Sequence, residues 1–246
     1  MKDIFILNTG PSLNLITGSE KDHIRENISI SVNTYLIWYE LLDIIPDYHI
    51  FIDNDNNSGA IIEETLKIHR EKKLTTKLIF SKANYERHKK LFIDYNIEPF
   101  DIIKSYHAAS WAHTPEDPFF HMNISGVALN WMCMKYGYSF NFKFLGYDGG
   151  EKSHFWTPTA SYLRANNLIS MIDARNVVFL LPNKNDYGTH TAETFFKCCS
   201  GKLVQVATEK NFLNRLYICN SNSKMLKKPF QYCNIKNLEV ATGLSG

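Results

Sequence analysis

The chain has 246 residues, of which 44% are hydrophobic and 21% are charged, and its formal net charge is +2 at pH 7. This is an ordinary globular composition, and so small a charge argues against nucleic acid as the main partner. No apolar run reaches the roughly 18 residues of a membrane span, and a strand begins almost directly after Met1. We therefore expect no signal peptide and a cytoplasmic protein.

Short apolar or alternating runs predict the strands of the fold. These runs comprise residues 4–7, 28–32, 48–52, 77–81, 140–145, 177–181 and 203–206. Helical stretches lie between and after them, at about residues 35–43, 60–72, 85–94, 123–136, 160–173, 191–199 and 209–216. Strands that alternate with helices at this spacing indicate an α/β fold with a mostly parallel sheet and helices on both faces.

The organisation along the chain favours one main domain over residues 1–220. Residues 101–121 lack a regular pattern and are expected to form a functional loop, and residues 149–190 are expected to include a lid-like segment. Residues 221–246 form a weakly patterned basic tail.

The first strand leads into the turn N-T-G-P-S, formed by Asn8, Thr9, Gly10, Pro11 and Ser12. Proline fits the first turn of a helix, because its missing N–H would have no partner there. A strand that turns into a helix N-terminus presents free N–H groups to an anion. The same pattern is also that of an ordinary strand–turn–helix, so the turn alone does not decide between the two.

Polar residues end several predicted strands. Asn8, Asn33, Asp53, Asn54 and Asp148 all follow strands, and ligands of open parallel sheets bind outside the carboxyl ends of the strands. Asn and Asp also occur in turns for backbone reasons of their own. Because they recur at equivalent strand ends, we expect these side chains to gather on one rim.

A helix that is apolar on nearly every side follows Asn123. Asn123 or Ser125 can cap it, and Gly137 can end it. An apolar helix of this kind is buried. Its start, with Gly126, offers a second set of free N–H groups and close approach to a ligand.

Cysteines and histidines show no metal-binding spacing. The five cysteines form no paired C-x-x-C motifs, which favours reduced thiols over a zinc site or a disulfide framework. His107, His113 and His121 have no regular ligand spacing either. We expect no metal and no cofactor.

In order, these motifs are N-x-G-P-S-L, an Asn after the second strand, a polar Asn-bearing end to the third, S-G-V at the buried helix and G-x-D after the next strand. This order resembles that of the bacterial sialyltransferases of glycosyltransferase family 42, and it is similar to related flagellin-modifying and uncharacterised proteins that share the domain. The resemblance covers roughly residues 3–206. It implies a Rossmann-like, doubly wound fold that binds CMP-N-acetylneuraminic acid without a metal ion.

The resemblance also implies site residues. Together with the rim and cap residues above, the predicted substrate-binding set is Asn8, Thr9, Gly10, Pro11, Ser12, Asn33, Asp53, Asn54, Asn123, Ser125, Gly126, Gly146 and Asp148. A late histidine is the implied general base, and both His190 and His154 are candidates. A tyrosine is implied to assist the departing phosphate; Tyr187 is the best placed, and Tyr147 and Tyr162 are others. The chain lacks the family's Arg before the buried helix and has Ile124 in place of its Thr.

The chemistry of inverting glycosyl transfer favours a histidine independently, because the base must be neutral near pH 7 and the pKa of histidine is roughly 6.5. We therefore predict a metal-independent, sialyltransferase-like enzyme that moves a sugar from a CMP-activated donor to a glycan acceptor. A catalytically inactive nucleotide-binding module and a related pyrophosphokinase-like enzyme are the alternatives. Peripheral membrane contact through the acceptor or the basic tail, and homo-oligomer formation, stay open.

Overall fold

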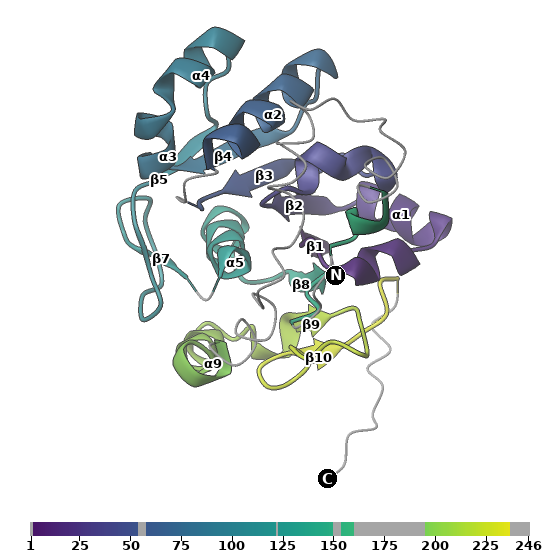
Figure 1. Ribbon diagram of the computed structural model, residues 1–246. Coiled ribbons are helices and arrows are strands. Elements are labelled where there is room, and N and C mark those ends of the chain that lie inside the picture. Colours follow the sequence, from purple (N-terminus) through teal and green to yellow (C-terminus); the bar gives the residue numbers. More distant parts are fainter. Residues whose placement is uncertain (1, 54–57, 122, 150–153, 160–194, 237–246) are drawn as a thin grey trace.

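The structure is a computed structural model, and it describes residues 2–53, 58–121, 123–149, 154–159 and 195–236 (Figure 1). Its centre is an eight-stranded sheet in the order β10-β9-β8-β1-β2-β3-β4-β5, in which all neighbouring strands are parallel. The strands are β1 (Asp3–Leu7), β2 (Ile28–Val32), β3 (Tyr48–Phe51), β4 (Lys77–Ser81), β5 (Asp101–Ile103), β8 (Asn141–Leu145), β9 (Leu216–Ile218) and β10 (Gln231–Tyr232). Two short strands, β6 (Tyr106–His107) and β7 (Phe119–Phe120), pair with each other outside this sheet.

Helices cover both faces of the sheet (Figure 1). They are the α-helices α1 (Gly18–Arg25), α2 (Ser58–Glu71), α3 (Lys82–Arg87), α4 (Lys89–Tyr95), α5 (Ile124–Tyr136) and α9 (Ser200–Glu209), and the 3-10 helices η1 (Pro11–Leu15), η2 (Tyr35–Leu41) and η3 (Leu213–Arg215). One core packs α5 and α9 against the sheet, and the other packs η1, η2, α2 and α4 against its opposite face. Strand β1 is buried along its whole length because it lies between these two cores.

The predicted fold class is confirmed: the chain forms a single α/β domain with a parallel sheet and helices on both faces. The strands of residues 28–32 and 77–81 have the predicted bounds. Helix α5 is buried through its first ten residues, as its all-round apolar pattern predicts. Asn123 caps this helix through its side chain, and Gly137, with a φ of 81°, follows its last turn.

Some expected elements are wrong. Residues 203–206 lie inside α9 and not in a strand, because Leu203, Val206 and Ala207 recur at helical spacing and are all buried. The helix expected at residues 209–216 is replaced by η3 and the start of β9. The segments that begin at Pro11 and Tyr35 form 3-10 helices, and the helix expected at residues 85–94 is broken at His88 into α3 and α4.

The basic tail also departs from expectation, because β10 lies within it and pairs with β9 as the last strand of the sheet. The predicted helix of residues 160–173 and the strand of residues 177–181 lie outside the described residues, as do Asn54, Tyr162, Tyr187 and His190. Of the lid-like segment, only residues 149 and 154–159 are described. Within the described part of the chain, no helix is both long and apolar enough to span a membrane.

Candidate functional site

The strand order changes direction between β1 and β8. From β1 the chain first adds β2, β3, β4 and β5 on one side, and then adds β8, β9 and β10 on the other. The order therefore reverses between β1 and β8, whose last residues, Leu7 and Leu145, are register partners. In open α/β sheets, ligands bind at such a topological switch point. The turns after these two strands carry seven of the thirteen predicted substrate-binding residues.

Two glycines bring these turns into contact. The backbone N–H of Gly10 donates to the carbonyl of Gly146 over 2.9 Å. A Cβ on Gly10 would lie 2.4 Å from Asp148 Oδ2 and 2.5 Å from Gly146 O, so a larger residue does not fit. Gly146 has a φ of 63°, which a side chain would strain. Both glycines are therefore required by the local backbone, whatever the ligand.

Asp148 occupies the anion-binding turn after β1. Its Oδ2 accepts from the Ser12 backbone N–H over 2.9 Å, and its Oδ1 accepts from the Ser12 hydroxyl over 2.6 Å. Asn220 Nδ2 also donates to Oδ1, over 2.7 Å. In this structure the donors of Ser12 in the G-P-S turn thus contact a carboxylate of the protein itself. That Ser12 and Asp148 bind substrate stays a prediction.

Asn8 and Ser125 are also used inside the protein. Asn8 is 5% exposed, and its Nδ2 donates to Ile6 O over 3.2 Å and to Leu145 O over 3.1 Å. The hydroxyl of Ser125, which is 2% exposed, donates to Asn8 Oδ1. These bonds fix the start of α5 to the end of β1, so both residues position the site in this structure.

The start of α5 keeps free backbone donors. The Asn123 side chain accepts from Gly126 N over 3.3 Å, and its Nδ2 donates to the Tyr147 hydroxyl over 2.9 Å. The backbone N–H groups of Ile124 and Ser125 have no hydrogen-bond partner within the described part of the chain. A 13-residue helix with free N–H groups at the switch point is suited to a phosphate.

His154 is held beside the end of β1. Its Nδ1 and the Thr9 hydroxyl form a hydrogen bond of 3.0 Å. The ring stacks on Trp156, with 4.8 Å between centroids, and Trp156 in turn stacks on Trp38. Burial lowers the pKa of His154, against an opposing effect of its contact with Thr9. Thr9 and Trp156 thus orient the imidazole, and burial favours its neutral form.

Asn33 directly follows β2, and Asp53 lies two residues after the end of β3. Asn33 adopts the left-handed conformation, with a φ of 53°, and its buried Oδ1 has no hydrogen-bond partner within the described residues. Asp53 is exposed, and its carbonyl accepts from Asn84 Nδ2 over 2.9 Å. The structure therefore places every predicted site residue that it describes at the carboxyl ends of the strands. Among them, Asn33 Oδ1 is a buried acceptor without a hydrogen-bond partner within the described residues.

Sequence reasoning missed three residues near the carboxyl ends of the strands. Asn220 binds Asp148 from a segment 72 residues away, and no local pattern predicts that contact. The rings of Tyr106 and His121 lie 4.7 Å apart, and the Tyr106 hydroxyl donates to Ile52 O, at the end of β3, over 3.5 Å. Only the aromatic content of residues 101–121 could have indicated this pair.

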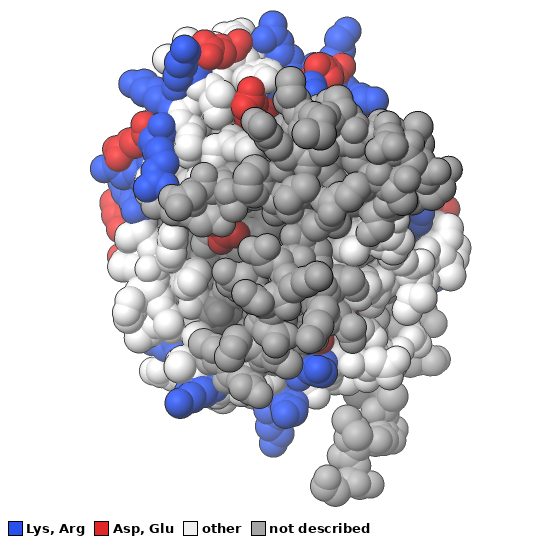
Figure 2. Space-filling model, viewed as in Figure 1, with Lys and Arg blue, Asp and Glu red and all other residues white. Residues whose placement is uncertain are grey.

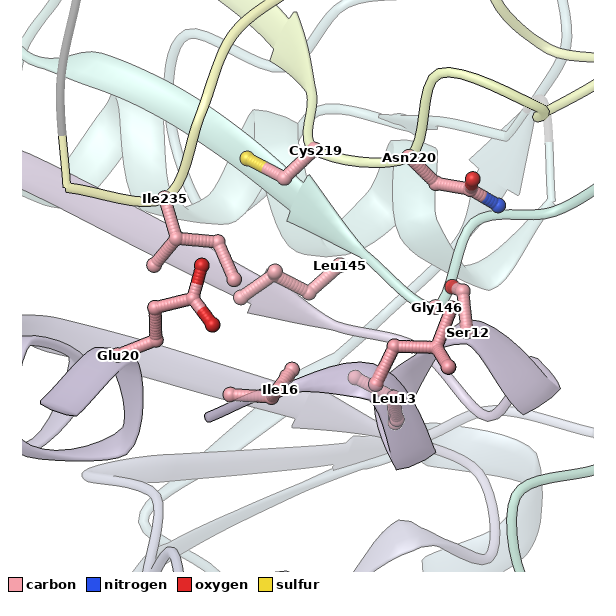
Figure 3. Close-up of a pocket in the computed structure, with 10 residues that line it drawn as sticks. Ser12, Leu13, Ile16, Glu20, Leu145, Gly146, Cys219, Asn220 and Ile235 are labelled. Carbon is pink, nitrogen blue, oxygen red and sulfur yellow. The ribbon is translucent and has the colours of Figure 1, made fainter. Parts of the chain in front are cut away.

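A small hollow lies beside the switch point (Figure 3). Its lining includes Ser12, Leu13, Gly146, Cys219, Asn220 and Ile235. Its volume is about 90 Å³, well below the roughly 300 Å³ at which ligand pockets begin. A nucleotide sugar therefore does not fit within this hollow.

Comparisons with known proteins give one match, and it is a match of fold. No family model matches the chain, and no curated protein matches it. Among solved structures, the MAf glycosyltransferase from Magnetospirillum magneticum AMB-1 is similar in fold, with a TM-score of 0.53 and 13% sequence identity. The match covers 98% of this chain and 34% of that protein, so the chain spans about a third of its length. The chain therefore shares its α/β fold with part of a glycosyltransferase.

Proposed function

We propose that this protein is a glycosyltransferase that uses a CMP-activated sugar of the sialic-acid type and transfers it to a glycan with inversion. One observation carries the proposal: Thr9 and Trp156 hold His154 at the switch point, where burial lowers its pKa. The fold match to a glycosyltransferase supports the reaction class. Membership of family 42 and the choice of donor rest on the sequence resemblance.

In the proposed reaction, His154 accepts the proton of the acceptor hydroxyl as that oxygen attacks the anomeric carbon. In the neutral tautomer that this role requires, Nδ1 carries the proton and donates to the Thr9 hydroxyl, so we assign the unprotonated Nε2 to the acceptor. The bond between the sugar and the CMP phosphate breaks as the new glycosidic bond forms. The proposal includes no metal ion and no cofactor.

We assign the donor phosphate to the N–H groups of Ile124 and Ser125, which have no partner among the described residues, because the turn at Ser12 already binds Asp148. A helix N-terminus stabilises the charge of the departing CMP. We assign Asn33 Oδ1, which lacks a partner among the described residues, to a donor hydroxyl or amino group. Asn8, Gly10, Gly146 and Asp148 then act by positioning these groups.

The acceptor is proposed to approach beside the segment that follows β9. Lys224, Lys227 and Lys228 are exposed on this segment, and the Lys224 backbone N–H donates to Asp148 O over 3.0 Å. Figure 2 shows Lys and Arg side chains at this lower edge of the molecule. These lysines suit an acceptor with negative charge, and peripheral membrane contact and a cytoplasmic location are part of the same proposal.

The test measures CMP release from CMP-N-acetylneuraminic acid, with UDP- and GDP-sugars as comparison donors. We expect turnover with the CMP donor, and His154→Gln should lower kcat by about 100-fold or more while CMP affinity stays similar. His113→Gln, which alters an exposed histidine, is the matched control. Because burial lowers the pKa of His154, the acidic limb of kcat/KM should lie below pH ~6.5.

The other outcomes separate the alternatives. If CMP raises the melting temperature but no donor is turned over, the protein is a binding module. If only His190→Gln removes turnover, the transferase function stands and the base is wrong. Turnover of a UDP- or GDP-sugar in place of the CMP donor would contradict the donor assignment.

A further inference from the structure

Two thiols meet at the edge of the sheet. Cys219 directly follows β9 and Cys233 directly follows β10, and their Sγ atoms lie 3.6 Å apart. The Cys219 backbone N–H donates to Phe144 O over 3.1 Å, and the Cys233 backbone N–H donates to Ile218 O over 3.4 Å. The backbone therefore holds both thiols in place, and a small movement of the side chains would bring the sulfurs to bonding distance.

One thiol of the pair is open to a small reagent. Cys219 is half-buried and lines the hollow beside the switch point, whereas Cys233 is fully buried. Figure 3 shows the Cys219 side chain above Leu145 and close to Ile235, on the wall of that hollow. Cys219 is therefore the more accessible thiol of the pair, and its sulfur lies 3.6 Å from that of Cys233.

The segment between the two cysteines supports the switch point. Asn220 donates to Asp148, and the Ser223 hydroxyl donates to Tyr147 O over 2.6 Å. Met225 lies against Gly149, where an added Cβ would approach its Cγ to 2.4 Å. Strand β10, which follows, pairs with β9 through two residues only. The segment is thus held to Asp148 at its start, and at its end it is held to the sheet by the two paired residues of β10.

We propose that Cys219 and Cys233 are a reversible oxidation site, at which a disulfide closes residues 219–233 into a loop that secures Asn220 against Asp148. The oxidant is a small-molecule disulfide such as oxidised glutathione. The contact with Cys233 and burial raise the pKa of the Cys219 thiol, so this thiol first loses its proton to solvent; the thiolate then attacks one of the two sulfurs of the oxidant and releases one reduced thiol. The Cys233 thiolate then attacks the Cys219 sulfur, the protein disulfide forms, and a second reduced thiol leaves. Two protein thiols are oxidised and one small disulfide is reduced to two thiols. The proposal does not depend on the identity of the sugar donor.

Tryptic mapping of the intact chain tests the site directly. After treatment with oxidised glutathione and blocking of the remaining thiols, cleavage separates residues 216–224, which contain Cys219, from residues 228–236, which contain Cys233. We expect these two peptides to appear linked, with the loss of two hydrogen atoms, and to separate after reduction. Cys198 is exposed, so Cys198→Ser is the matched control and should leave the link intact.

Stability supplies a second measurement on the unmodified chain. Closing a loop of this length should raise the melting temperature by about 6 °C or more, and a reductant should reverse the rise. Cys219→Ala should abolish both the linked peptide and the rise. The proposal is overturned if both peptides are recovered separately with blocked thiols while Cys198 is glutathionylated, or if linkage leaves the melting temperature unchanged.

Discussion

Ser12 and Asp148 bind each other twice, through the backbone N–H and the hydroxyl of Ser12, at 2.9 and 2.6 Å. The turn after β1 therefore uses its anion-binding donors to hold the turn after β8. The consequence is that a carboxylate of the protein itself occupies the Ser12 donors and ties the two turns together.

Replacing Asp148 should destabilise the fold. Asp148→Asn keeps the size of the side chain but sets an amide N–H₂ against the Ser12 and Asn220 donors. Leaving such donors unpaired in a site that is 6% exposed should cost about 1–3 kcal/mol. Urea unfolding gives the free energy directly. Asp94→Asn, at an exposed carboxylate of α4, is the control and should change it little. Equal stability for both variants would show that the Ser12–Asp148 contact is not formed.

Gly10→Ala and Gly18→Ala form a matched pair. A Cβ on Gly10 would lie 2.4 Å from Asp148 Oδ2, whereas a Cβ on Gly18 has no atom within 4 Å. We expect Gly10→Ala to destabilise the protein by about 1–3 kcal/mol through overpacking. Gly18→Ala lies in the first turn of α1 and should be neutral or stabilise by up to about 1 kcal/mol. Thermal melting of the two variants should shift in these different directions, and a tolerated Gly10→Ala would refute the close contact of the two turns.

Asn33→Gly separates the backbone role of Asn33 from its side-chain role. Glycine keeps the left-handed conformation at φ 53° and removes the unpartnered Oδ1. If that oxygen binds the donor, CMP affinity should fall by about 3- to 10-fold while the protein stays folded. Asn96→Gly, at φ 51° after α4, is the control and should leave affinity unchanged. Calorimetric titration with CMP measures both, and unaltered affinity of Asn33→Gly would remove Asn33 from the donor site.

His49 should make stability depend on pH. It is fully buried, its Nδ1 is 2.8 Å from the Ser31 hydroxyl, and burial lowers its pKa to about 3. The unfolded chain, with a histidine pKa of roughly 6.5, therefore binds more protons between these two values. Stability should be complete above pH ~6.5 and should fall at lower pH by up to about 1.4 kcal/mol per pH unit from this group.

The slope of unfolding free energy against pH checks this. His49→Asn can keep a partner for Ser31, and it should flatten the slope between pH ~4 and ~6 whatever its effect on absolute stability. His113→Asn, at an exposed position, should leave the slope as in the parent protein. An unchanged slope in His49→Asn would mean that His49 does not stay neutral in the fold.

Local sequence was sufficient to predict which polar residues lie at the carboxyl ends of the strands. It was not sufficient to predict the long-range contacts that hold these residues. Asn8, Asn33 and Asp148 were predicted to share a rim because a strand end is a local feature and parallel strands share one direction. The contact of Asn220 with Asp148 could not be predicted, because it joins two loop residues 72 positions apart in the sequence. Val204, Gln205 and Val206 alternate like a strand, yet the neighbouring helical repeat of Leu203, Val206 and Ala207 prevails once packed against the core. The three residues of β9 are too few to give a periodic signal.

The central position of β1 has a consequence for how the chain folds during synthesis. Asp3 contacts Asn141, 138 residues later, and β1 completes its pairing only when β8 has been made. Synthesis proceeds at about 5–20 residues per second, so one side of this buried strand stays unpaired for on the order of ten seconds. Parallel pairing over such a separation also slows folding itself. The strand order that places β1 beside β8 therefore leaves one side of β1 unpaired in the nascent chain until residue 145 has emerged, and an unpaired strand edge favours aggregation.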